Sequence, residues 1–386
     1  MGPPPRVWNP AFARLWGATF SVYFSFYLLL PVLPVYALSL GIGESAIGLI
    51  IGIFALTAMI LKPGTGWVMD WHGRRGILTA GAALFGLASL LYPATRSTAS
   101  LLLVRVVHGA GMGLFPTAGV AVVADLAPVE RRGEAMGLFG MAANLAMAIG
   151  PTLGVSMEGR LGFLGLCLIS AALAGLGVGL TLLVPETGLL GARPPFRAGQ
   201  LLAPQTLRPA AVTLALFLPY GALVSFLPLL TQARGAGNPG LFFTLMAIAL
   251  LAVRAQAGQL SDRIGRRAVV APAAVVIAAS LAVLAMARAP WTIYGAGFLF
   301  GLGLGSAQPT LMAWAADLVA PVDRGKAMAT FYTAWELGIG GGSILFGLLL
   351  PLGGFEALFA TGAAIALAAG ALALCRSPRG TRAGAG

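Results

Sequence analysis

Charged residues are scarce in this sequence. They make up 9% of the 386 residues, whereas hydrophobic residues make up 58% and the mean hydropathy is +0.90. Because soluble domains carry about 25% charged residues, this composition excludes an ordinary soluble domain. Cysteine is also rare: Cys167 and Cys375 lie far apart in apolar runs, a pattern that matches no disulfide framework.

Motifs for catalysis or cofactor binding are missing as well. The sequence contains no nucleotide-binding loop, no zinc-ligand spacing and no acyl-transfer elbow. We therefore expect no enzyme, no cofactor and no metal site. The 24 basic residues outnumber the 12 acidic ones, which in a soluble protein would suggest a nucleic-acid partner. In this apolar background the excess is instead typical of the cytoplasmic loops of a membrane protein.

Long apolar segments fill most of the chain. About 20 residues of helix cross a bilayer core of about 30 Å, and lipid offers no water to unpaired backbone groups. We predict an all-α integral membrane protein of twelve transmembrane helices. The expected spans are residues 13–38, 44–69, 76–95, 99–124, 134–157, 161–184, 208–232, 238–261, 268–288, 291–317, 326–351 and 355–375.

Basic residues predict the orientation of these spans. With a cytoplasmic N-terminus, the outer loops hold only Arg96, Arg160, Arg234 and Arg288, and most other Lys and Arg residues fall on the inner side. Because Lys and Arg are enriched in cytoplasmic loops, we expect both termini to be cytoplasmic and the protein to lie in the inner (cytoplasmic) cell membrane, as a monomer.

The chain repeats itself at an offset of 192 residues. The segment from Gly66 to Arg75 matches the one from Gly258 to Arg267, and the further pairs are Asp125 with Asp317 and Lys62 with Arg254. Parallel repeats place a pseudo-twofold axis along the membrane normal and a site between the halves. We expect six-helix bundles at 1–184 and 208–386, joined by a cytoplasmic linker at 185–207.

The repeated pattern Gly-x-x-x-Asp-x-x-Gly-Arg-Arg resembles a signature of the major facilitator superfamily, and the resemblance covers every predicted span. It implies loops that hold a cytoplasmic gate closed, with the Asp pairing with cations and a neighbouring helix N-terminus. The gate residues so implied, together with two Asp at inner span ends, are Asp70, Gly73, Arg74, Arg75, Asp262, Arg263, Gly265, Arg266, Arg267, Asp125 and Asp317. Trp71 stands where an Arg usually follows the Asp, so the first loop lacks one usual partner unless Arg74 or Arg75 serves. A basic turn that only fixes topology is the alternative.

Span four contains Arg105 and His108. Arg105 and Gly109 resemble the family's Arg-x-x-x-Gly signature, where the Arg is linked to proton coupling. A cation inside a span costs roughly 2.5–3.5 kcal/mol on insertion scales and usually faces a cavity or a partner. His108 follows on the same helical side and titrates near neutral pH when unperturbed. Alternatively, Arg105 snorkels to the outer interface and His108 only packs.

Span five carries Gly137, Gly150, Pro151 and Gly154. These residues resemble the signature of the family's antiporters, with Ala146 and Val155 replacing two of its glycines. In the family this signature distinguishes drug and metabolite exporters from uptake symporters. A kinked helix with small packing residues is the alternative.

Span eleven holds Glu336, the one acid expected near mid-membrane. An intramembrane acid is a functional hypothesis by default, so Glu336 is our candidate proton carrier, with Arg105 and His108; a structural hydrogen bond is the alternative. Polar and aromatic candidates for a substrate cavity are Tyr23, Tyr27, Asn144, Tyr220, Gln256, Tyr332 and Trp335, each of which could also be a packing residue.

Three functions follow from these patterns. The first is a proton-coupled exporter of small amphipathic molecules that works by alternating access. The second is an uptake symporter or facilitator for a sugar or organic anion, in which Lys62, Arg105 and Arg254 hold the anion. The third is a membrane receptor without transport. The expected partners are a small-molecule substrate, protons and the lipid bilayer.

Overall fold

The computed structural model describes residues 7–187 and 202–375, apart from the side chain of Asp70. Most of the predicted linker and the Asp70 side chain thus lie outside the described residues. The described part is almost entirely helical, without strands, and the predicted all-α membrane fold is confirmed. Its helices are α1 (Pro10–Leu29), α2 (Leu33–Ser39), α3 (Glu44–His72), α4 (Arg74–Leu91), α5 (Thr98–Leu126), α6 (Arg132–Leu182), α7 (Leu207–Ala233), α8 (Pro239–Ile264), α9 (Arg266–Met286), α10 (Pro290–Asp317) and α11 (Arg324–Leu374).

Glycines at equivalent positions of the repeat divide the two longest helices. Gly162 in α6 and Gly354 in α11 have φ angles of 69° and 67°, a region that other residues rarely adopt. Each lies close to the boundary predicted between two spans. Nine helical stretches of the described chain are long and apolar enough to cross a membrane by length and composition. Because α10 is not among them, the count of twelve spans stays a prediction.

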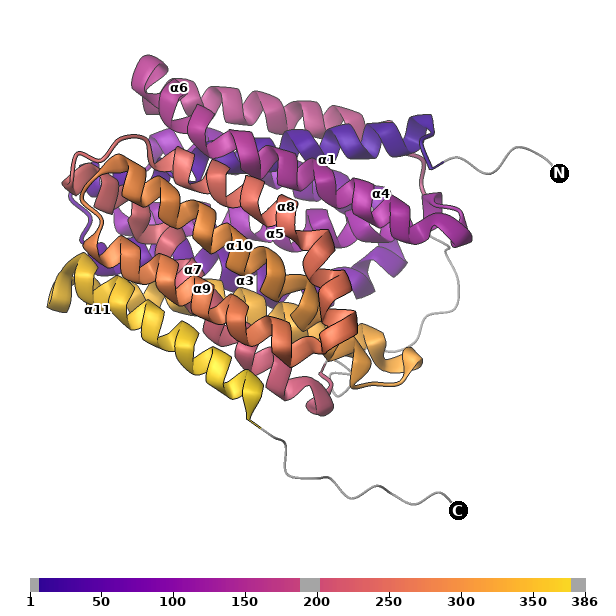
Figure 1. The fold of residues 1–386 in the computed structure, drawn as a ribbon. Coiled ribbons are helices and arrows are strands. Elements are labelled where there is room, and N and C mark those ends of the chain that lie inside the picture. Colours follow the sequence, from indigo (N-terminus) through magenta and orange to yellow (C-terminus); the bar gives the residue numbers. More distant parts are fainter. Residues whose placement is uncertain (1–6, 188–201, 376–386) are drawn as a thin grey trace.

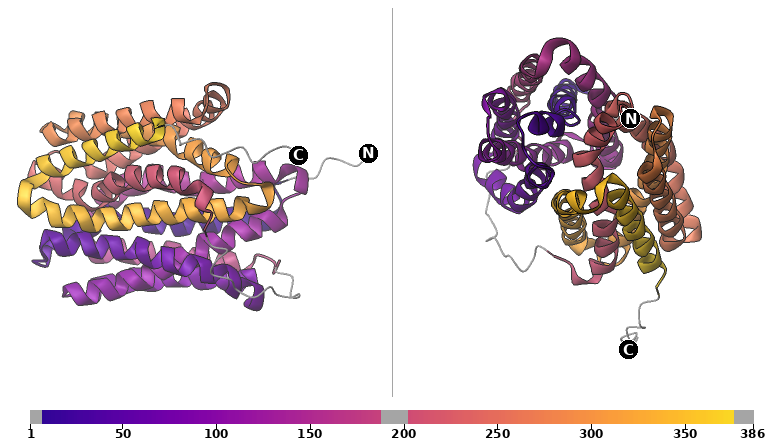
Figure 2. Two further views of the ribbon diagram at one scale, coloured as in Figure 1. Left: turned by 90° about the horizontal axis from the view of Figure 1, so that it is seen from below. Right: turned by 90° about the vertical axis from the view of Figure 1, so that its left-hand side faces the viewer.

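The helices group into two bundles, which we call the N half (α1–α6) and the C half (α7–α11) (Figure 1; Figure 2, right). Within the N half, α1 packs on α6, α3 on α5, and α4 on α5 and α6. The same pairing recurs in the C half, where α7 packs on α11, α8 on α10, and α9 on α10 and α11. The predicted repeat is therefore a repeat of packing as well as of sequence.

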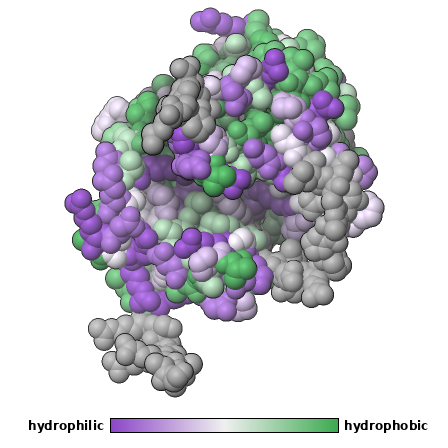
Figure 3. All heavy atoms as spheres, turned by 90° about the vertical axis from the view of Figure 1, so that its right-hand side faces the viewer, coloured by the Kyte–Doolittle hydropathy of each residue, from purple (hydrophilic) through white to green (hydrophobic). Residues whose placement is uncertain are grey.

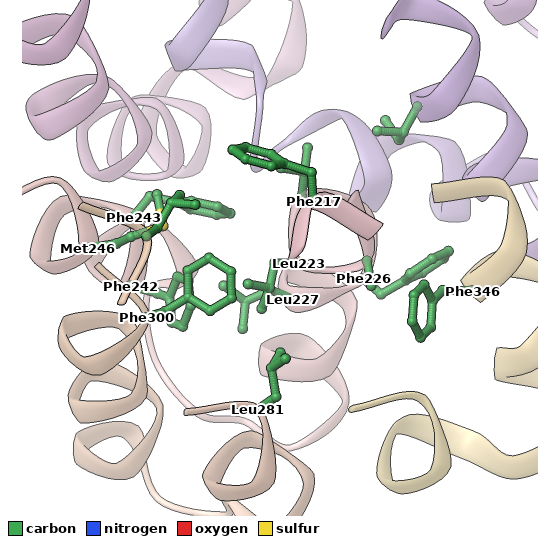
Figure 4. Close-up of a cluster of buried hydrophobic side chains, with 14 of the residues drawn as sticks. Phe217, Leu223, Phe226, Leu227, Phe242, Phe243, Met246, Leu281, Phe300 and Phe346 are labelled. Carbon is green, nitrogen blue, oxygen red and sulfur yellow. The ribbon is translucent and has the colours of Figure 1, made fainter. Parts of the chain in front are cut away.

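Aromatic side chains fill the core of the C half (Figure 4). Phe226, Phe242 and Phe300 are fully buried, and each belongs to a different helix. Tyr220 on α7 stacks on Phe300 of α10 with ring centres 6.1 Å apart, and a Cβ on Gly297 of α10 would lie 2.9 Å from the Phe242 ring of α8. Because such rings bury about 150–250 Å² each, these contacts hold α7, α8 and α10 together as one unit. A rigid unit of this kind can move as a whole against the other half.

Two seams join the halves: α3 against α11, and α6 against α8. The seams are tight at the end away from the repeated Gly-Arg-Arg loops, which we call the far end. There Ser45 Oγ donates to the Gly347 carbonyl at 2.9 Å, and the hydroxyls of Thr152 and Thr244 lie 2.8 Å apart. A Cβ on Gly240 would collide with the backbone of Pro151, so this glycine is required for the close approach.

The opposite end, which carries the Gly-Arg-Arg loops and is called here the motif end, is open between the halves. On the seam helices, Cβ atoms built at Gly64, Gly66, Gly137 and Gly258 would meet nothing within 4 Å. Figure 3 views this end and shows a hollow between the halves with hydrophilic residues on its rim. The described conformation is thus closed at the far end and open at the motif end.

Substitution of Gly240 by Val should open the far end. The added side chain overpacks the α6–α8 seam, which typically costs about 1–3 kcal/mol, enough to shift a two-state equilibrium several-fold. Spin labels at Ala99→Cys and Trp291→Cys, exposed equivalent positions at the far end, should report a longer distance. Gly175→Ala, where the added Cβ meets nothing within 4 Å, is the control; equal distances in all three proteins would contradict the close-approach role.

Candidate functional site

An ion pair between Lys62 and Glu336 joins the two halves. Lys62 Nζ on α3 contacts Glu336 Oε1 on α11, and the side chains are 26% and 12% exposed. The pair lies on the α3–α11 seam, between the close far-end contacts and the open motif end. Both charges lie within apolar helices. Each is therefore stabilised mainly by the opposite charge of its partner and by the hollow between the halves.

Tyrosines and a second cation surround this pair. Lys62 Nζ lies 6.0 Å from the ring centre of Tyr332 on α11. Tyr23 on α1 interacts electrostatically with Glu336 and Tyr332, and Arg254 on α8 interacts with Tyr332. Four helices from both halves therefore contribute polar groups to one place.

Aromatic rings extend the site along both halves. Tyr23 and Tyr27 stack on α1 with ring centres 6.3 Å apart, and Tyr27 interacts electrostatically with Tyr220 on α7 across the interface. On the C-half side, Trp335 stacks on Phe217 at 4.2 Å. The predicted cavity residues on α1, α7 and α11 thus come together, and they combine apolar ring faces with hydroxyls.

Asn144 and Arg254 form the counterpart of the ion pair in the repeat. Asn144 on α6 corresponds to Glu336 on α11, and Arg254 on α8 corresponds to Lys62 on α3. Helices α6 and α8 form the second seam. Both side chains are partly exposed, and within the described residues neither makes a hydrogen bond or an ion pair. One seam therefore carries a balanced pair, and the other carries a cation opposite a neutral amide.

Arg105 and His108 lie apart from Glu336. Arg105 is 4% exposed; its Nε and Nη2 each donate at 3.0 Å to the carbonyls of Ile50 and Ile51, and its guanidinium lies 4.3 Å from the centre of the Phe54 ring. It does not snorkel to the interface. His108 is buried, with Nδ1 2.9 Å from the Tyr92 hydroxyl.

A cavity of about 10 Å³ beside these two residues is also lined by Val224 from the C half. Among the described residues, no contact links Arg105 or His108 to Glu336. We expected Arg105, His108 and Glu336 to form one proton site, but in this structure Arg105 and His108 lie apart from Glu336.

Gln256 does not line the space between the halves. It borders a separate groove of about 340 Å³ within the C half, formed with Leu260, Arg263 and Ser306. Successive helical residues are turned by about 100°, so Arg254 and Gln256 point about 200° apart and cannot both face the seam. The prediction of Gln256 as a cavity residue is corrected on this ground.

The loop residues predicted to form a gate pair within their own halves in this conformation. Arg74 contacts Asp125, and Arg266 contacts Asp262 and, at 2.9 Å, Asp317. Described side chains form no ion pair between the halves at the motif end. This separation follows from the open hollow, which keeps the two loops apart.

Glycines at both loops end one helix and begin the next. Gly73 and Gly265 have φ angles of 78° and 94°, which explains their place in the pattern. In the N half, the Glu186 carboxylate accepts the backbone N–H of Arg74 at 2.7 Å and that of Arg75 at 3.3 Å. An anion at a helix N-terminus is favoured by the helix dipole, so Glu186 stabilises the first turn of α4. In the C half, Arg267 lies 5.4 Å from the centre of the Trp314 ring, whereas Arg263 is exposed.

The antiporter-like residues of span five lie at helix crossings. A Cβ on Gly150 would meet the Tyr27 side chain at 2.6 Å, and one on Gly154 would collide with the backbone of Leu28, both on α1. Pro151 meets Gly240 of the other half. Gly137, in contrast, borders open space, so it makes no helix contact in this conformation.

Sequence reasoning missed Lys62 as the partner of Glu336. It identified Lys62 only as an intramembrane cation and as the counterpart of Arg254. One signal could have found the pair: Lys62 and Glu336 are opposite charges within apolar spans, where a single charge is costly. Spans two and eleven also meet when two parallel repeats face each other across a pseudo-twofold axis.

Comparison with known proteins identifies one relative named for export and one named for drug resistance. The chain is 25% identical over 366 residues to the staphylopine export protein of Staphylococcus aureus, covering 90% of this chain and 91% of that protein. It is 30% identical over 135 residues to the quinolone resistance protein NorA of Staphylococcus aureus, covering 35% of each chain.

Solved structures share the fold. The nucleoside transporter NupG (D323A mutant) superimposes with a TM-score of 0.81 at 14% identity, covering 94% of this chain and 99% of that one. The human organic anion transporter MFSD10 (TETRAN) gives a TM-score of 0.68 at 21% identity, covering 96% and 100%. A family model matches residues 15–254 and 210–385, and the chain therefore belongs to the Major Facilitator Superfamily.

Proposed function

We propose that this transporter exports small amphipathic molecules in exchange for protons. The observation that carries the proposal is the Lys62–Glu336 pair, a protonatable carboxylate at the junction of the two halves. The similarity to a staphylopine exporter over most of the chain and to a quinolone resistance protein over part of it supports export as the direction. The protein acts as a monomer in the cytoplasmic membrane, with both termini and the motif end inside.

Glu336 carries the proton in this mechanism. As a carboxylate it is held by Lys62 and is available to a substrate that enters from the motif end. A proton that arrives from the far side, once the halves have rocked, neutralises Glu336 and ends its attraction for Lys62 and for the substrate. Proton binding and substrate binding therefore exclude each other, which is the requirement for exchange.

The repeated loops form the gate in the opposite conformation. Arg266 pairs with both Asp262 and Asp317 while the motif end is open, and Arg74 pairs with Asp125. When the halves close at this end, the same charges come within reach of the facing helices and hold it closed. Arg105 and His108 lie at the far-end side of the interface and line the proton's route there.

Replacement of Glu336 by Gln should abolish proton-driven transport. The neutral amide can neither take up or release the proton nor attract the substrate as a carboxylate does, so a pH gradient no longer drives flux in proteoliposomes. Staphylopine and quinolones are suitable first probes, because relatives carry these names. The control is Glu158→Gln, which changes an acid of α6 just before the break at Gly162 that forms no ion pair with a described side chain. Undiminished gradient-driven flux in the Glu336 variant would refute the mechanism.

Stability should depend on Lys62 and Glu336 jointly. Removal of one partner of a buried ion pair costs up to about 3–5 kcal/mol, whereas removal of both charges is often neutral; the 26% exposure of Lys62 reduces the cost. Lys62→Gln and Glu336→Gln should each lower the melting temperature in detergent, and the double variant should recover most of the loss. Additive losses would indicate that the pair does not stabilise this conformation.

A further inference from the structure

The charges around Glu336 do not balance. Lys62 and Arg254 occupy equivalent places on the two seams, but only Lys62 faces an acid, because Asn144 takes the place of Glu336 on α6. Arg254 has no ion-pair partner among the described residues. It lies on α8, which packs against α6 across the halves, at the position equivalent to Lys62, and within electrostatic range of Tyr332. The site therefore holds two cations and one acid, with one positive charge in excess.

Proton exchange restricts what can bind at Glu336. A substrate competes with a proton for this carboxylate only through a cationic group of its own. A substrate with only anionic groups would bind best when Glu336 is protonated and Lys62 is free. It would then travel together with the proton, which is cotransport rather than exchange. This step rests on the proposed function.

A purely cationic substrate does not fit either. Lys62 lies against Glu336, and Arg254 adds a second positive charge, so a simple amine would meet net repulsion at close range. An anionic group on the same molecule removes the repulsion by pairing with Arg254, whose planar guanidinium suits a carboxylate. The stacked rings of Trp335 and Phe217, and of Tyr23 and Tyr27, accept an apolar portion.

We propose that the transported molecule is a zwitterion that carries an amine, a carboxylate and an apolar group. Its ammonium group replaces the Lys62 ammonium at Glu336, and its carboxylate binds Arg254 and the released Lys62. The substrate thus inserts into the cross-half ion pair and exchanges partners with it. Each charged group then has an opposite charge beside it, because Arg254 and Lys62 share the substrate carboxylate, and this lowers the cost of keeping these groups inside the membrane.

Three probes of nearly equal size test the charge class: N-benzylglycine with both charges, N-benzylglycinamide with only the amine, and N-benzoylglycine with only the carboxylate. Binding is measured as thermal stabilisation of the purified protein in nanodiscs, with each probe at millimolar concentration. We expect stabilisation by N-benzylglycine alone. Equal or greater stabilisation by either singly charged probe, or none by the zwitterion, would overturn the proposal.

Arg254→Gln identifies the carboxylate partner. Loss of one charged partner should weaken N-benzylglycine binding at least about tenfold and narrow its advantage over N-benzylglycinamide. Arg288→Gln, which removes an exposed cation outside the site, should bind both probes as the wild-type protein does. Unchanged zwitterion binding in Arg254→Gln would exclude this role for Arg254.

Flux measurements separate this proposal from the proposed function. If the zwitterion is the preferred ligand but a pH gradient drives no flux of it, the proposal of proton exchange is contradicted and the proposal of a zwitterionic substrate is supported. If a pH gradient drives flux and the amine-only probe is the better ligand, the proposal of proton exchange is supported and the proposal of a zwitterionic substrate is contradicted.

Discussion

A carboxylate inside a membrane protein must have a partner, and this constraint accounts for the central feature of the fold. Glu336 lies in an apolar helix, where an isolated charge costs several kcal/mol. Its partner, Lys62, belongs to the other half of the molecule. The interaction that makes the acid tolerable therefore also connects the two bundles. Any event that neutralises Glu336 or gives it another partner, such as protonation or the arrival of an ammonium group, changes how strongly the halves are held together.

The repeat provides the mechanical setting for this pair. Glycines on the seam helices, such as Gly48 and Gly240 at equivalent positions, allow backbones to touch at the far end. The same helices diverge at the motif end, where Gly64 and Gly258 border open space. Aromatic side chains are buried within both halves, such as Phe85 and Phe115 in the N half and Phe242 and Phe300 in the C half. Rocking then needs only the seams to change. The two seams differ in charge, because Glu336 lies opposite Lys62 on one seam and Asn144 takes the place of the acid on the seam of Arg254.

Much of the fold could be predicted because lipid restricts the choice to helices and because the repeat is visible in the sequence. The breaks at Gly162 and Gly354 lie close to the expected boundaries. The site was harder to predict. Hydropathy and spacing identify polar residues within spans but not the direction in which they point, so Gln256 was assigned to the cavity although it lies in a groove of the C half. Pairing across halves, as between Lys62 and Glu336, requires the packing of distant segments. The conformation, open at the motif end, is also not encoded in any local pattern.

The central claim, that the charge state of Glu336 biases the conformation through Lys62, can be measured directly. Spin labels at Glu130→Cys and Val322→Cys, exposed equivalent positions at the motif end, report its opening by double electron–electron resonance in nanodiscs, in a background without Cys167 and Cys375. A drop in pH should move the wild-type protein towards shorter distances, and Glu336→Gln should give short distances at every pH. The account would be contradicted by a wild-type distance distribution that does not change with pH, or by a Glu336→Gln protein whose distances still respond to pH as those of the wild type do.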